Sequence, residues 1–440
     1  MPTSRLTVLG GGGFRVPLVY GALLGGDSPI GSVVLHDVDP VRLAAIGRVL
    51  AAQAETFPGA PAVSATTDLT EALTGADFVF SAIRVHGLAG RVIDERVALG
   101  EGVLGQETVG AGGIAYGLRT VPVAAAIARR IALVAPQAWV INFTNPAGLV
   151  TEAMATHLGD RVIGICDSPS ALGRRVIRAL GLPPGGARLS YAGLNHLGWL
   201  TGVWRDGEDL LPRLLADDEA LASFEEGRLF GASRLRTLGA VPNEYLHYYY
   251  DTAHLVRAEL RAPETRGEFL LRQQTECYDS LSAHADALAT WRATLRQRDS
   301  TYLALEGLGE RDDAEGGGYE EVALALMTAI ASDTPADLIL NVRNRGTLSG
   351  LDADAVVEVP CRVDGSGAHP YPGAALPPHG TSLVQRIKAT ERAVLSAAAE
   401  RSRAVAVRAM ASHPLIDSVP VARRLIAEYQ RRLPELAYLR

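Results

Sequence analysis

Two residues of the sequence, Cys166 and His196, have side chains that could bind a catalytic metal ion. Cys166 lies in the stretch GICDSP (164–169), and His196 lies in the stretch GLNHLG (193–198). Thiolate and imidazole groups are ligands of divalent metals, and two protein ligands leave coordination positions open for a substrate. Each residue alone also fits a structural role, because a lone cysteine is commonly a small buried side chain. The sequence does not show whether the two side chains converge.

A cluster of tyrosines could supply a general base. The stretch PNEYLHYYY (242–250) contains four tyrosines, of which Tyr245 is the first. A tyrosine can remove a proton from a substrate when a neighbouring metal or cation lowers its pKa. The same residues could instead form a packed aromatic face, and their spacing does not choose among them.

Two polar stretches are typical of ligand-binding loops. The stretch NFTNP (142–146) follows an apolar run, and polar side chains at the carboxyl end of a parallel strand face the crevice in which ligands bind. The stretch GQETVGAGG (105–113) is short, polar and rich in glycine, which favours a ligand-contacting loop over a linker. The first stretch could equally be a turn, and the second could be a flexible surface loop.

The amino terminus carries the pattern of a dinucleotide-binding loop. The run VLGGGG follows a short apolar segment, so Gly10, Gly12 and Gly13 would let a pyrophosphate approach the backbone at a helix N-terminus. Asp37 ends the second predicted strand and suits the hydroxyl groups of a ribose. Arg15 occupies the position of the usual third glycine. The glycine run alone would also fit a tight turn.

The elements that must position these residues alternate between strands and helices over about the first 165 residues. Strands that alternate with helices indicate βαβ units and a parallel, doubly wound sheet. The predicted strands are 6–9, 32–37, 62–65, 77–82, 138–142 and 162–165, and helices are predicted from about 16, at 40–54 and at 69–73.

The pattern changes after about residue 190, where helical stretches become longer. The acidic, glycine-rich stretch 312–318 is the best candidate for a loop in this half. We therefore expect an α/β protein with a Rossmann-like, doubly wound domain at 1–190 and an α+β domain at 191–440. The elements predicted for the second half are helices at 267–298, at 319–332 and from 381 to the C-terminus, with strands at 338–341 and 356–359.

Composition argues against several classes of protein. The chain has 440 residues, of which 48% are hydrophobic and 21% are charged, as in ordinary soluble enzymes. Its 42 basic and 49 acidic residues give a net charge of −7, which argues against nucleic-acid binding. Three widely spaced cysteines favour a reducing, cytoplasmic compartment over a disulfide framework. Because Arg129 and Arg130 interrupt the most apolar stretch, no membrane span is expected.

The ordered set of motifs resembles glycoside hydrolase family 4, whose members are glycosidases that depend on NAD and a divalent metal. The resemblance covers nearly the whole chain, from the glycine run and the strand end at Asp37 to the stretches around Cys166 and His196. The further motifs that carry it are GLAGR (87–91), GQET (105–108), NFTNP (142–146), YLHYY (245–249), NVRNRG (341–346), EVPC (358–361) and SHP (412–414).

The resemblance implies a fold similar to those of lactate and malate dehydrogenases, with an added C-terminal domain. It implies that Cys166 and His196 hold a Mn²⁺-like ion whose shell is completed by hydroxyls O2 and O3 of the sugar. Asn145 and Asn195 would contact that sugar, and Tyr245 matches the base proposed for the family.

The resemblance also implies an anionic site. In phosphoglucosidase members, the positions of Arg91 and Arg266 contact the 6-phosphate of the substrate, and Arg84 and Arg343 are weaker candidates for the same role. The substrate that we expect is therefore a 6-phosphorylated glucoside.

The mechanism that the resemblance implies begins with hydride transfer from C3 of the sugar to NAD⁺, which acidifies the proton on C2. Tyr245 removes that proton, the aglycone leaves from C1, water adds, and the hydride returns to C3. Asp167 follows the metal-binding cysteine, as in α-acting members, in which this aspartate is proposed to protonate the leaving group. The regions of Tyr245 and Arg266 are closer to β-acting members, so we expect a 6-phospho-β-glucosidase.

Alternatives stay open at this point. The substrate could be a 6-phospho-α-glucoside or a sugar without phosphate, and the aglycone and the physiological metal are not specified. An NAD-dependent 2-hydroxy-acid dehydrogenase would share the fold, but it would need a histidine paired with an aspartate, and an arginine for the substrate carboxylate. A catalytically inactive, nucleotide-binding relative is a third alternative. The resemblance also implies a homodimer or a homotetramer.

Overall fold

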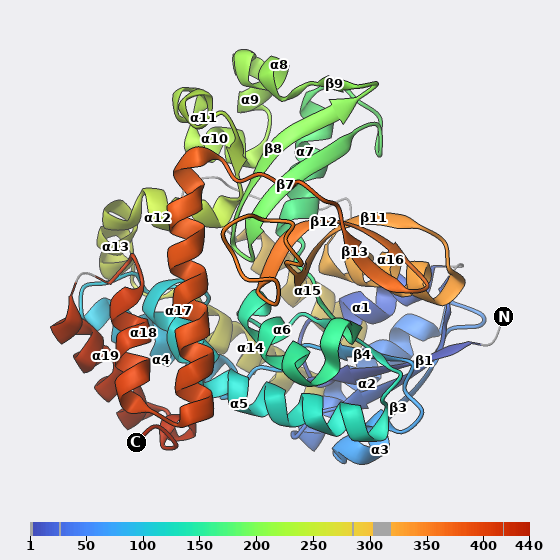
Figure 1. Cartoon of the computed structure of the whole chain (residues 1–440). Helices are drawn as coiled ribbons and strands as arrows, with labels where there is room; N and C mark the ends of the chain where they lie inside the picture. The colour runs from blue at the N-terminus through green and yellow to red at the C-terminus, as the bar shows by residue number, and fades with distance from the viewer. Residues whose placement is uncertain (1–2, 26–27, 284–285, 302–317, 417) are drawn as a thin grey trace.

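The computed structural model describes residues 3–25, 28–283, 286–301, 318–416 and 418–440. Its strands form one sheet that runs from the N-terminal half of the chain into the C-terminal half (Figure 1). The strands are β1 (Ser4–Leu9), β2 (Ile30–His36), β3 (Ala62–Thr66), β4 (Phe78–Ser81), β5 (Trp139–Asn142), β6 (Val162–Gly164), β7 (Arg188–Leu194), β8 (Leu197–Arg205), β9 (Glu208–Asp209), β10 (Val241–Pro242), β11 (Ala336–Arg343), β12 (Val356–Asp364) and β13 (Gly367–Pro370).

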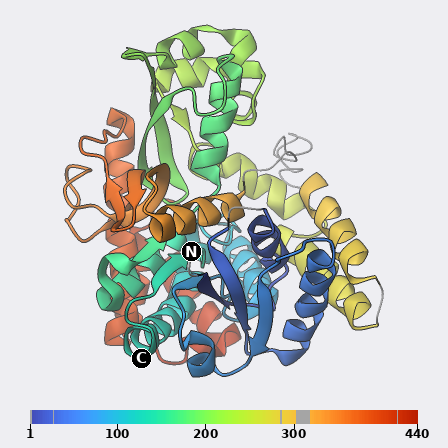
Figure 2. The ribbon, with the colours of Figure 1, turned by 90° about the vertical axis from the view of Figure 1, so that its right-hand side faces the viewer.

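Helices cover the parallel part of the sheet and form the C-terminal end of the chain (Figures 1 and 2). They are α1 (Val16–Leu23), α2 (Pro40–Ala54), α3 (Leu69–Leu73), α4 (Gly87–Gly100), α5 (Gly110–Val134), α6 (Ala147–Leu158), α7 (Ser168–Ala179), α8 (Leu211–Ala216), α9 (Asp218–Ala222), α10 (Glu225–Phe230), α11 (Ala232–Leu238), α12 (His247–Tyr250), α13 (Thr252–Arg261), α14 (Arg266–Ser282), α15 (Ala287–Ser300), α16 (Tyr319–Ser332), α17 (Thr381–Glu400), α18 (Arg403–Ser412) and α19 (Val419–Arg432).

Six parallel strands form the part of the sheet that carries the glycine loop. Their order is β3-β2-β1-β4-β5-β6, which is the order of a doubly wound dinucleotide-binding sheet. Parallel strands covered by helices on both faces are apolar throughout, and every residue of β4 is buried. The predicted doubly wound sheet is confirmed, and each of the six strands ends within about two residues of its predicted bounds.

The C-terminal half extends the same sheet with antiparallel strands. β11 joins β6 through one pair of residues, Asn341 and Gly164, and β12 joins β7 through Glu358 and Gly193. β7 and β8 form a hairpin that rises above the parallel part of the sheet (Figures 1 and 2). The predicted α+β character of this half is confirmed, but the hairpin was missed by the sequence analysis.

Capping residues divide two stretches that the sequence pattern joined. The stretch 267–298 contains two helices instead of one, because α14 ends at Ser282 and the Asp286 side chain caps the start of α15. The C-terminal stretch contains α17, α18 and α19, and Arg401 ends α17 in a left-handed conformation with φ +56°. The predicted loop 312–318 lies outside the described residues except for Gly318.

Three helices from the C-terminal half cover the N-terminal half of the molecule. α14 packs against α4, α15 packs against α2, and α16 packs against α1. Figure 2 shows the yellow helices α14 and α15 beside the blue helices and strands. The carboxyl ends of the parallel strands therefore face elements that come from much later in the sequence.

One described helix, α5, is long and apolar enough to cross a membrane by length and composition. However, 72% of its most apolar window is buried inside the protein, where α5 packs against α6 and α17. It is therefore a core helix of this fold.

Candidate active site

A pocket of about 830 Å³ lies at the carboxyl ends of the parallel strands, between the two halves of the chain. This is the crevice in which doubly wound sheets bind ligands. Most of the residues that the sequence analysis placed at the site line it, and the exceptions are Gly12 and the weaker candidate Arg343. The lining residues from that set are Gly10, Gly13, Asp37, Arg84, Arg91, Asn145, Cys166, Asp167, Asn195, His196, Tyr245 and Arg266.

The glycine loop turns the chain directly after β1. Gly10 has φ +81°, and a β-carbon at this position would lie 2.6 Å from the carbonyl oxygen of Ala82, so only glycine fits. The Gly10 amide donates to the His36 carbonyl oxygen at 2.9 Å. The Gly12 amide donates to the Asp37 carboxylate at 3.0 Å. Asp37 thus binds the loop and lines the pocket with it.

Three aromatic side chains from the C-terminal half hold the carbonyl groups of this loop. They lie on α14, α15 and at the start of α16, and each donates one hydrogen bond to a loop carbonyl oxygen. The pairs are Tyr278 Oη with Gly12 at 2.6 Å, Trp291 Nε1 with Phe14 at 2.8 Å and Tyr319 Oη with Arg15 at 2.9 Å.

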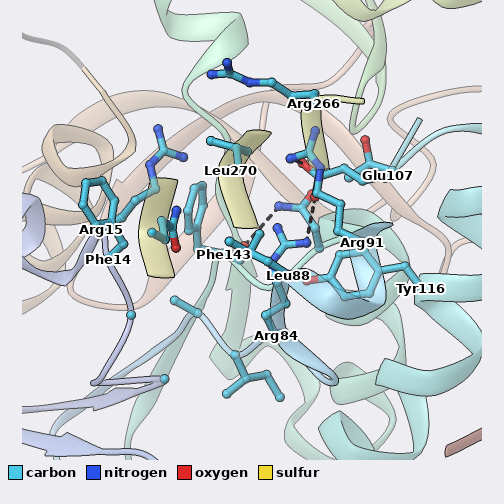
Figure 3. A pocket seen from close by; sticks show the side chains of 18 of the residues that line it. Phe14, Arg15, Arg84, Leu88, Arg91, Glu107, Tyr116, Phe143, Arg266 and Leu270 are labelled. Atoms are coloured by element: carbon cyan, nitrogen blue, oxygen red, sulfur yellow. Dashed lines mark hydrogen bonds and ion pairs between the residues drawn. The ribbon is translucent and has the colours of Figure 1, made fainter. Parts of the chain in front are cut away.

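Arg15, which replaces the usual third glycine, is the N-cap residue of α1. Its guanidinium lies 4.7 Å from the ring centroid of Tyr319 and 5.7 Å from that of Phe143. These contacts are cation–π interactions that fix the direction of the side chain. Figure 3 shows Arg15 and Phe143 at one side of the pocket. The loop therefore places a cation close to the helix N-terminus.

His196 lies in the turn between β7 and β8 with φ +61°, a conformation that few residues other than glycine adopt. Its Nδ1 lies 2.9 Å from Oγ1 of Thr108, whose hydroxyl donates to Oε1 of Gln106 at 3.1 Å. The Thr108 oxygen must therefore accept the proton of Nδ1, which leaves Nε2 of His196 with a free lone pair. Burial lowers the pKa of His196 to about 4, so the ring is neutral at pH 7. This is the form of histidine that binds metals.

Cys166 follows β6 and is 4% exposed. Burial and the nearby carboxylates of Glu358 and Asp167 raise the pKa of its thiol well above the ordinary value. A thiolate in this environment needs a positive charge beside it, and a divalent cation would supply that charge. Among the described residues no group of three or more His, Cys, Asp and Glu side chains is placed to hold a metal. A site made of Cys166 and His196 would thus keep positions open for a substrate.

Tyr245 lies beside His196. Its amide donates to the Asn243 side chain at 2.9 Å, which starts a short 3-10 turn at Glu244–Leu246. The Tyr245 ring stacks on the imidazole of His196, with ring centroids 3.5 Å apart and planes 3° from parallel. Of the other three tyrosines in this stretch, only Tyr248 also lines the pocket.

Asn145 follows β5 and lines the same pocket. Its Nδ2 donates to the Phe143 carbonyl oxygen at 3.3 Å. Its Oδ1 is buried and has no hydrogen-bond partner among the described residues. A buried acceptor without a partner is costly, so a ligand that donates a hydrogen bond here would be favoured. We call the region formed by Asn145, Cys166, Asp167, His196 and Tyr245 the metal end of the pocket.

Another region of the pocket is rich in arginine, and we call its residues Arg84, Arg91, Arg266 and Arg298 the arginine end. Arg91 donates to Glu95 and to Glu107 at 2.7 Å each, and Arg84 donates to Glu107 at 2.7 Å. Burial alone would raise the pKa of Glu107, but Arg84 and Arg91 hold it at about 2. Figure 3 shows both guanidinium groups near Glu107, above Tyr116.

Arg266 is the first residue of α14 and points away from Arg91 (Figure 3). Its Nη1 donates to the Thr301 hydroxyl at 2.7 Å, and its Nη2 donates to the Arg298 carbonyl oxygen at 3.0 Å. Arg266 thus holds the end of α15 while it lines the pocket.

Arg298 is a pocket residue that the sequence analysis missed. Burial and the neighbouring cations Arg15, Arg266 and Arg91 lower the pKa of Arg298 to about 9. None of the hydrogen bonds and ion pairs formed among the described residues involves its guanidinium. A half-buried cation with cationic neighbours is a ready site for an anion.

The pocket residues to which the sequence analysis assigned no role differ in how clearly the sequence marks them. Glu107 and Thr108 belong to the stretch 105–113, which was identified as a ligand-contacting loop but without assigned roles. Arg298 carries no local signal, since Arg292 and Arg296 share its helix and lie outside the pocket. Arg343, a weaker sequence candidate, does not line the pocket, and its guanidinium donates to the Ala155 carbonyl oxygen at 2.7 Å.

The chain matches two family models, the family 4 glycosyl hydrolase model at residues 5–182 and the family 4 glycosyl hydrolase C-terminal domain model at residues 191–416. It is 31% identical over 439 residues to a probable 6-phospho-beta-glucosidase of Bacillus subtilis (strain 168), covering 96% of this chain and 95% of that one. These matches include pocket-lining residues from both halves of the chain.

Solved structures of similar proteins share the fold. The 6-phospho-beta glucosidase from Thermotoga maritima with NAD and glucose-6-phosphate gives a TM-score of 0.87 at 25% identity, with complete coverage of both chains. A 6-phospho-alpha-glucosidase from gut microorganisms with NAD and Mn²⁺ gives 0.82 at 26% identity, again with complete coverage of both. The lactate dehydrogenase of Eimeria maxima gives 0.54 at 13% identity, covering 90% of this chain and 96% of that one.

These findings confirm the resemblance on which the sequence analysis relied, and they confirm the likeness of the fold to lactate dehydrogenase. They include both β-acting and α-acting relatives. With matched models over residues 5–182 and 191–416, the chain belongs to glycosyl hydrolase family 4.

Proposed function

We propose that this protein hydrolyses the O-glycosidic bond of 6-phospho-β-glucosides, with NAD and a divalent ion such as Mn²⁺ as cofactors. The observation that carries the proposal is that one pocket joins a glycine loop, a Cys166–His196 pair with a free Nε2 atom, and a group of arginines. Dinucleotide, divalent cation and phosphate are the three ligands that such groups bind best.

The residues present fit these cofactors. Cys166 and His196 would hold the divalent ion, and Gly10, Gly13 and Asp37 would hold the dinucleotide, with Gly12 fixing Asp37. When bound, the dinucleotide supplies oxidation and re-reduction at C3 of the sugar, and the ion supplies Lewis-acid stabilisation of charge on O2 and O3.

The chain's own residues would handle the protons. The Tyr245 hydroxyl group, in its ionised form, would take the proton from C2, and the electron pair of that C–H bond would form a C1–C2 double bond as the aglycone leaves. Asp167 would give a proton to the departing oxygen. Addition of water at C1 and return of the proton to C2 would follow, and re-reduction at C3 would complete hydrolysis. Asn145 and Asn195 would hold the sugar hydroxyls during these steps.

The arginine end would bind the 6-phosphate. Arg91 and Arg266 are the residues assigned by resemblance, and both also bind protein groups. Arg298, which has no anionic partner within hydrogen-bond or ion-pair distance among the described residues, is a further phosphate ligand in this proposal. Glucose-6-phosphate is bound in the Thermotoga maritima structure, which supports a phosphorylated substrate.

The second candidate is a 6-phospho-α-glucosidase. Asp167 favours it, because the carboxyl group follows Cys166 and lines the pocket, where it could protonate an α-linked leaving group. Relatives of both specificities are known, so the anomer must be measured.

The experiment measures nitrophenol release from α- and β-nitrophenyl glucosides, each with and without a 6-phosphate. Each assay contains Mn²⁺ and a thiol, with NAD⁺ present or omitted. We expect release only from the phosphorylated β-glucoside and only with NAD⁺ and metal. Release from the α-glucoside alone would favour the second candidate, and equal rates without phosphate would remove the anionic site. NADH accumulating on a hydroxy acid, with no nitrophenol release, would indicate a dehydrogenase.

We further propose the organisation expected from the sequence. The chain would divide into an NAD-binding domain at 1–190 and a domain for substrate, metal and oligomerisation at 191–440, and the matched models meet between 182 and 191. We propose a cytoplasmic homodimer or homotetramer that binds neither nucleic acid nor membrane. Light scattering of the purified protein tests the oligomeric state.

A further inference from the structure

Glu358 is a fully buried carboxylate behind the metal end of the pocket. It lies on β12, opposite Gly193 of β7, and its exposed fraction is 0%. Three neutral groups donate to it, and it forms no ion pair with a lysine or arginine among the described residues. The donors are Asn341 Nδ2 at 2.9 Å, Asn195 Nδ2 at 3.2 Å and Tyr191 Oη at 3.2 Å.

These contacts fix the orientation of two side-chain amides. Both asparagines contact the same carboxyl oxygen, Oε1, which accepts hydrogen bonds whether the group is ionised or protonated on Oε2. Each asparagine therefore turns its NH₂ group toward Glu358 and its carbonyl oxygen away. Asn341 is itself fully buried, and its Oδ1 has no partner among the described residues. Asn195 is half-buried and lines the pocket, so its oxygen can meet a ligand.

The position of Asn195 gives this oxygen a function. Asn195 and His196 together form the turn between β7 and β8, and Tyr245 stacks on the imidazole of His196. Asn145, which also belongs to the metal end, commits its NH₂ group to the Phe143 carbonyl and has no partner for its own Oδ1 among the described residues. Two amide oxygens at one end of a pocket require hydrogen-bond donors, and the hydroxyl groups of a sugar are such donors.

We propose that Glu358 is a positioning residue that holds the Asn195 carbonyl oxygen toward the pocket, where this oxygen accepts a hydrogen bond from one hydroxyl group of the sugar. Replacing Glu358 would then act on sugar binding through Asn195, although Glu358 does not line the pocket. This inference rests on the proposed function, because it takes the ligand to be a phosphorylated sugar.

The test measures the affinity of the protein for glucose 6-phosphate by calorimetry, with NAD⁺ and Mn²⁺ present. Asn195→Ala should weaken binding by about five- to tenfold, as expected for one hydrogen bond. Glu358→Ala should weaken it by a similar factor, and the double variant should be no weaker than either single variant. Glu358→Gln should stay within about twofold of the original protein, because its amide oxygen can accept from both asparagines.

Monodeoxy analogues of glucose 6-phosphate identify the hydroxyl group. Asn195→Ala should weaken the binding of every analogue except the one that lacks the partner hydroxyl. Glu152→Gln is the control, since Glu152 is a buried carboxylate outside the pocket that accepts from the Val356 amide of β12 and, unlike Glu358, forms ion pairs with Lys388 and Arg392. It should leave the affinity unchanged.

The failures can be told apart. The inference is overturned if Asn195→Ala binds glucose 6-phosphate with unchanged affinity. It is also overturned if this variant binds every monodeoxy analogue more weakly by the same factor. Both outcomes hold whether or not the protein has glycosidase activity. Fully additive losses in the double variant overturn the positioning role of Glu358. If Glu358→Ala fails to fold, the affinities of Asn195→Ala and Glu358→Gln still test the inference, because only the first of these variants should bind glucose 6-phosphate more weakly. An original protein that binds glucose 6-phosphate but hydrolyses no phosphoglucoside contradicts the proposed function alone.

Discussion

The metal end and the arginine end of the pocket carry opposite charges, but in both of them the surroundings disfavour the charged form of one side chain. At the metal end, burial and the nearby carboxylates of Glu358 and Asp167 raise the pKa of the Cys166 thiol. At the arginine end, burial and the neighbouring cations lower the pKa of Arg298. Each end therefore disfavours the charged form of its own central group. At pH 7 this costs stability at the arginine end, where Arg298 stays charged, whereas the Cys166 thiol stays neutral until a cation binds. A cation at one end and an anion at the other would relieve both, so the pocket is built for two ligands of opposite charge.

The largest effect should come from removing the thiol of the metal end. Cys166→Ser should lower metal-dependent glycosidase activity by at least about a thousandfold, because a serine hydroxyl is a poor substitute for a thiolate ligand. Activity is measured by nitrophenol release, and Mn²⁺ affinity is measured by electron paramagnetic resonance. NAD⁺ affinity serves as the control and should change by less than about twofold. A fully active Cys166→Ser protein would show that this end does not hold the metal.

The next effect concerns Tyr245, which lies at the metal end but is not a proposed ligand. Tyr245→Phe should slow exchange of the C2 proton of the sugar with deuterated solvent by about 10²- to 10³-fold, as for the loss of a general base. The exchange is followed by proton NMR on the product. Tyr248→Phe is the matched control on the same stretch. Unchanged exchange in Tyr245→Phe would assign the base to another residue.

At the arginine end, Arg298→Gln should raise KM for the phosphorylated substrate by about 10- to 100-fold, the loss of one charge-assisted contact. The KM for a substrate without phosphate should stay the same. Arg296→Gln provides the control, since Arg296 is an exposed residue of the same helix that does not line the pocket. Equal effects on both substrates would remove Arg298 from the phosphate site.

The smallest effect concerns His413, a buried residue outside the pocket, where no bound ligand would stabilise its charged form. Burial, with Arg386 nearby, lowers the pKa of His413 to about 3, and this residue is 4% exposed. Its neutral form is favoured in the folded state, so its stabilising contribution is complete above about pH 6.5 and is lost as the pH falls toward 3. His413 should therefore account for about 2 kcal/mol of the loss in unfolding free energy between pH 7 and pH 5.

Urea unfolding at the two pH values checks this, with His413→Asn as the variant, because asparagine can keep the acceptor for the Leu415 amide. The variant should lose about 2 kcal/mol less than the original protein over that range. Glucose 6-phosphate affinity should be the same in both proteins at pH 7. Identical pH dependence in the two proteins would assign the acid sensitivity elsewhere.

The two ends also differ in how far the sequence could predict them. Cys166 and Asn145 follow strands of the parallel sheet, and the alternation of strands and helices predicted their meeting at one edge. His196 was identified by resemblance, but its strained turn depends on the pairing of β7 with β8 and β12, which the local pattern did not reveal. Long-range strand pairing leaves only a weak local signal.

At the arginine end, the resemblance implied Arg91 and Arg266 but not the protein groups that hold them. Arg298 reaches the pocket because α15 ends beside Arg266, and this arrangement follows from the packing of α14 and α15 on the first half of the chain. The break between these helices was also missed, because helical propensity gives no account of where a cap such as Asp286 will end one helix and begin another.

The hydrogen bonds from Tyr278, Trp291 and Tyr319 to the glycine loop bear on how this enzyme could be dissected. A fragment that stopped at residue 190 would contain the whole parallel sheet and the whole nucleotide motif. It would nevertheless leave three loop carbonyl groups without the donors that bind them in the intact chain. The nucleotide-binding unit is therefore contiguous in sequence but not autonomous in structure, and chimeras with related enzymes should exchange α14 to α16 together with the loop.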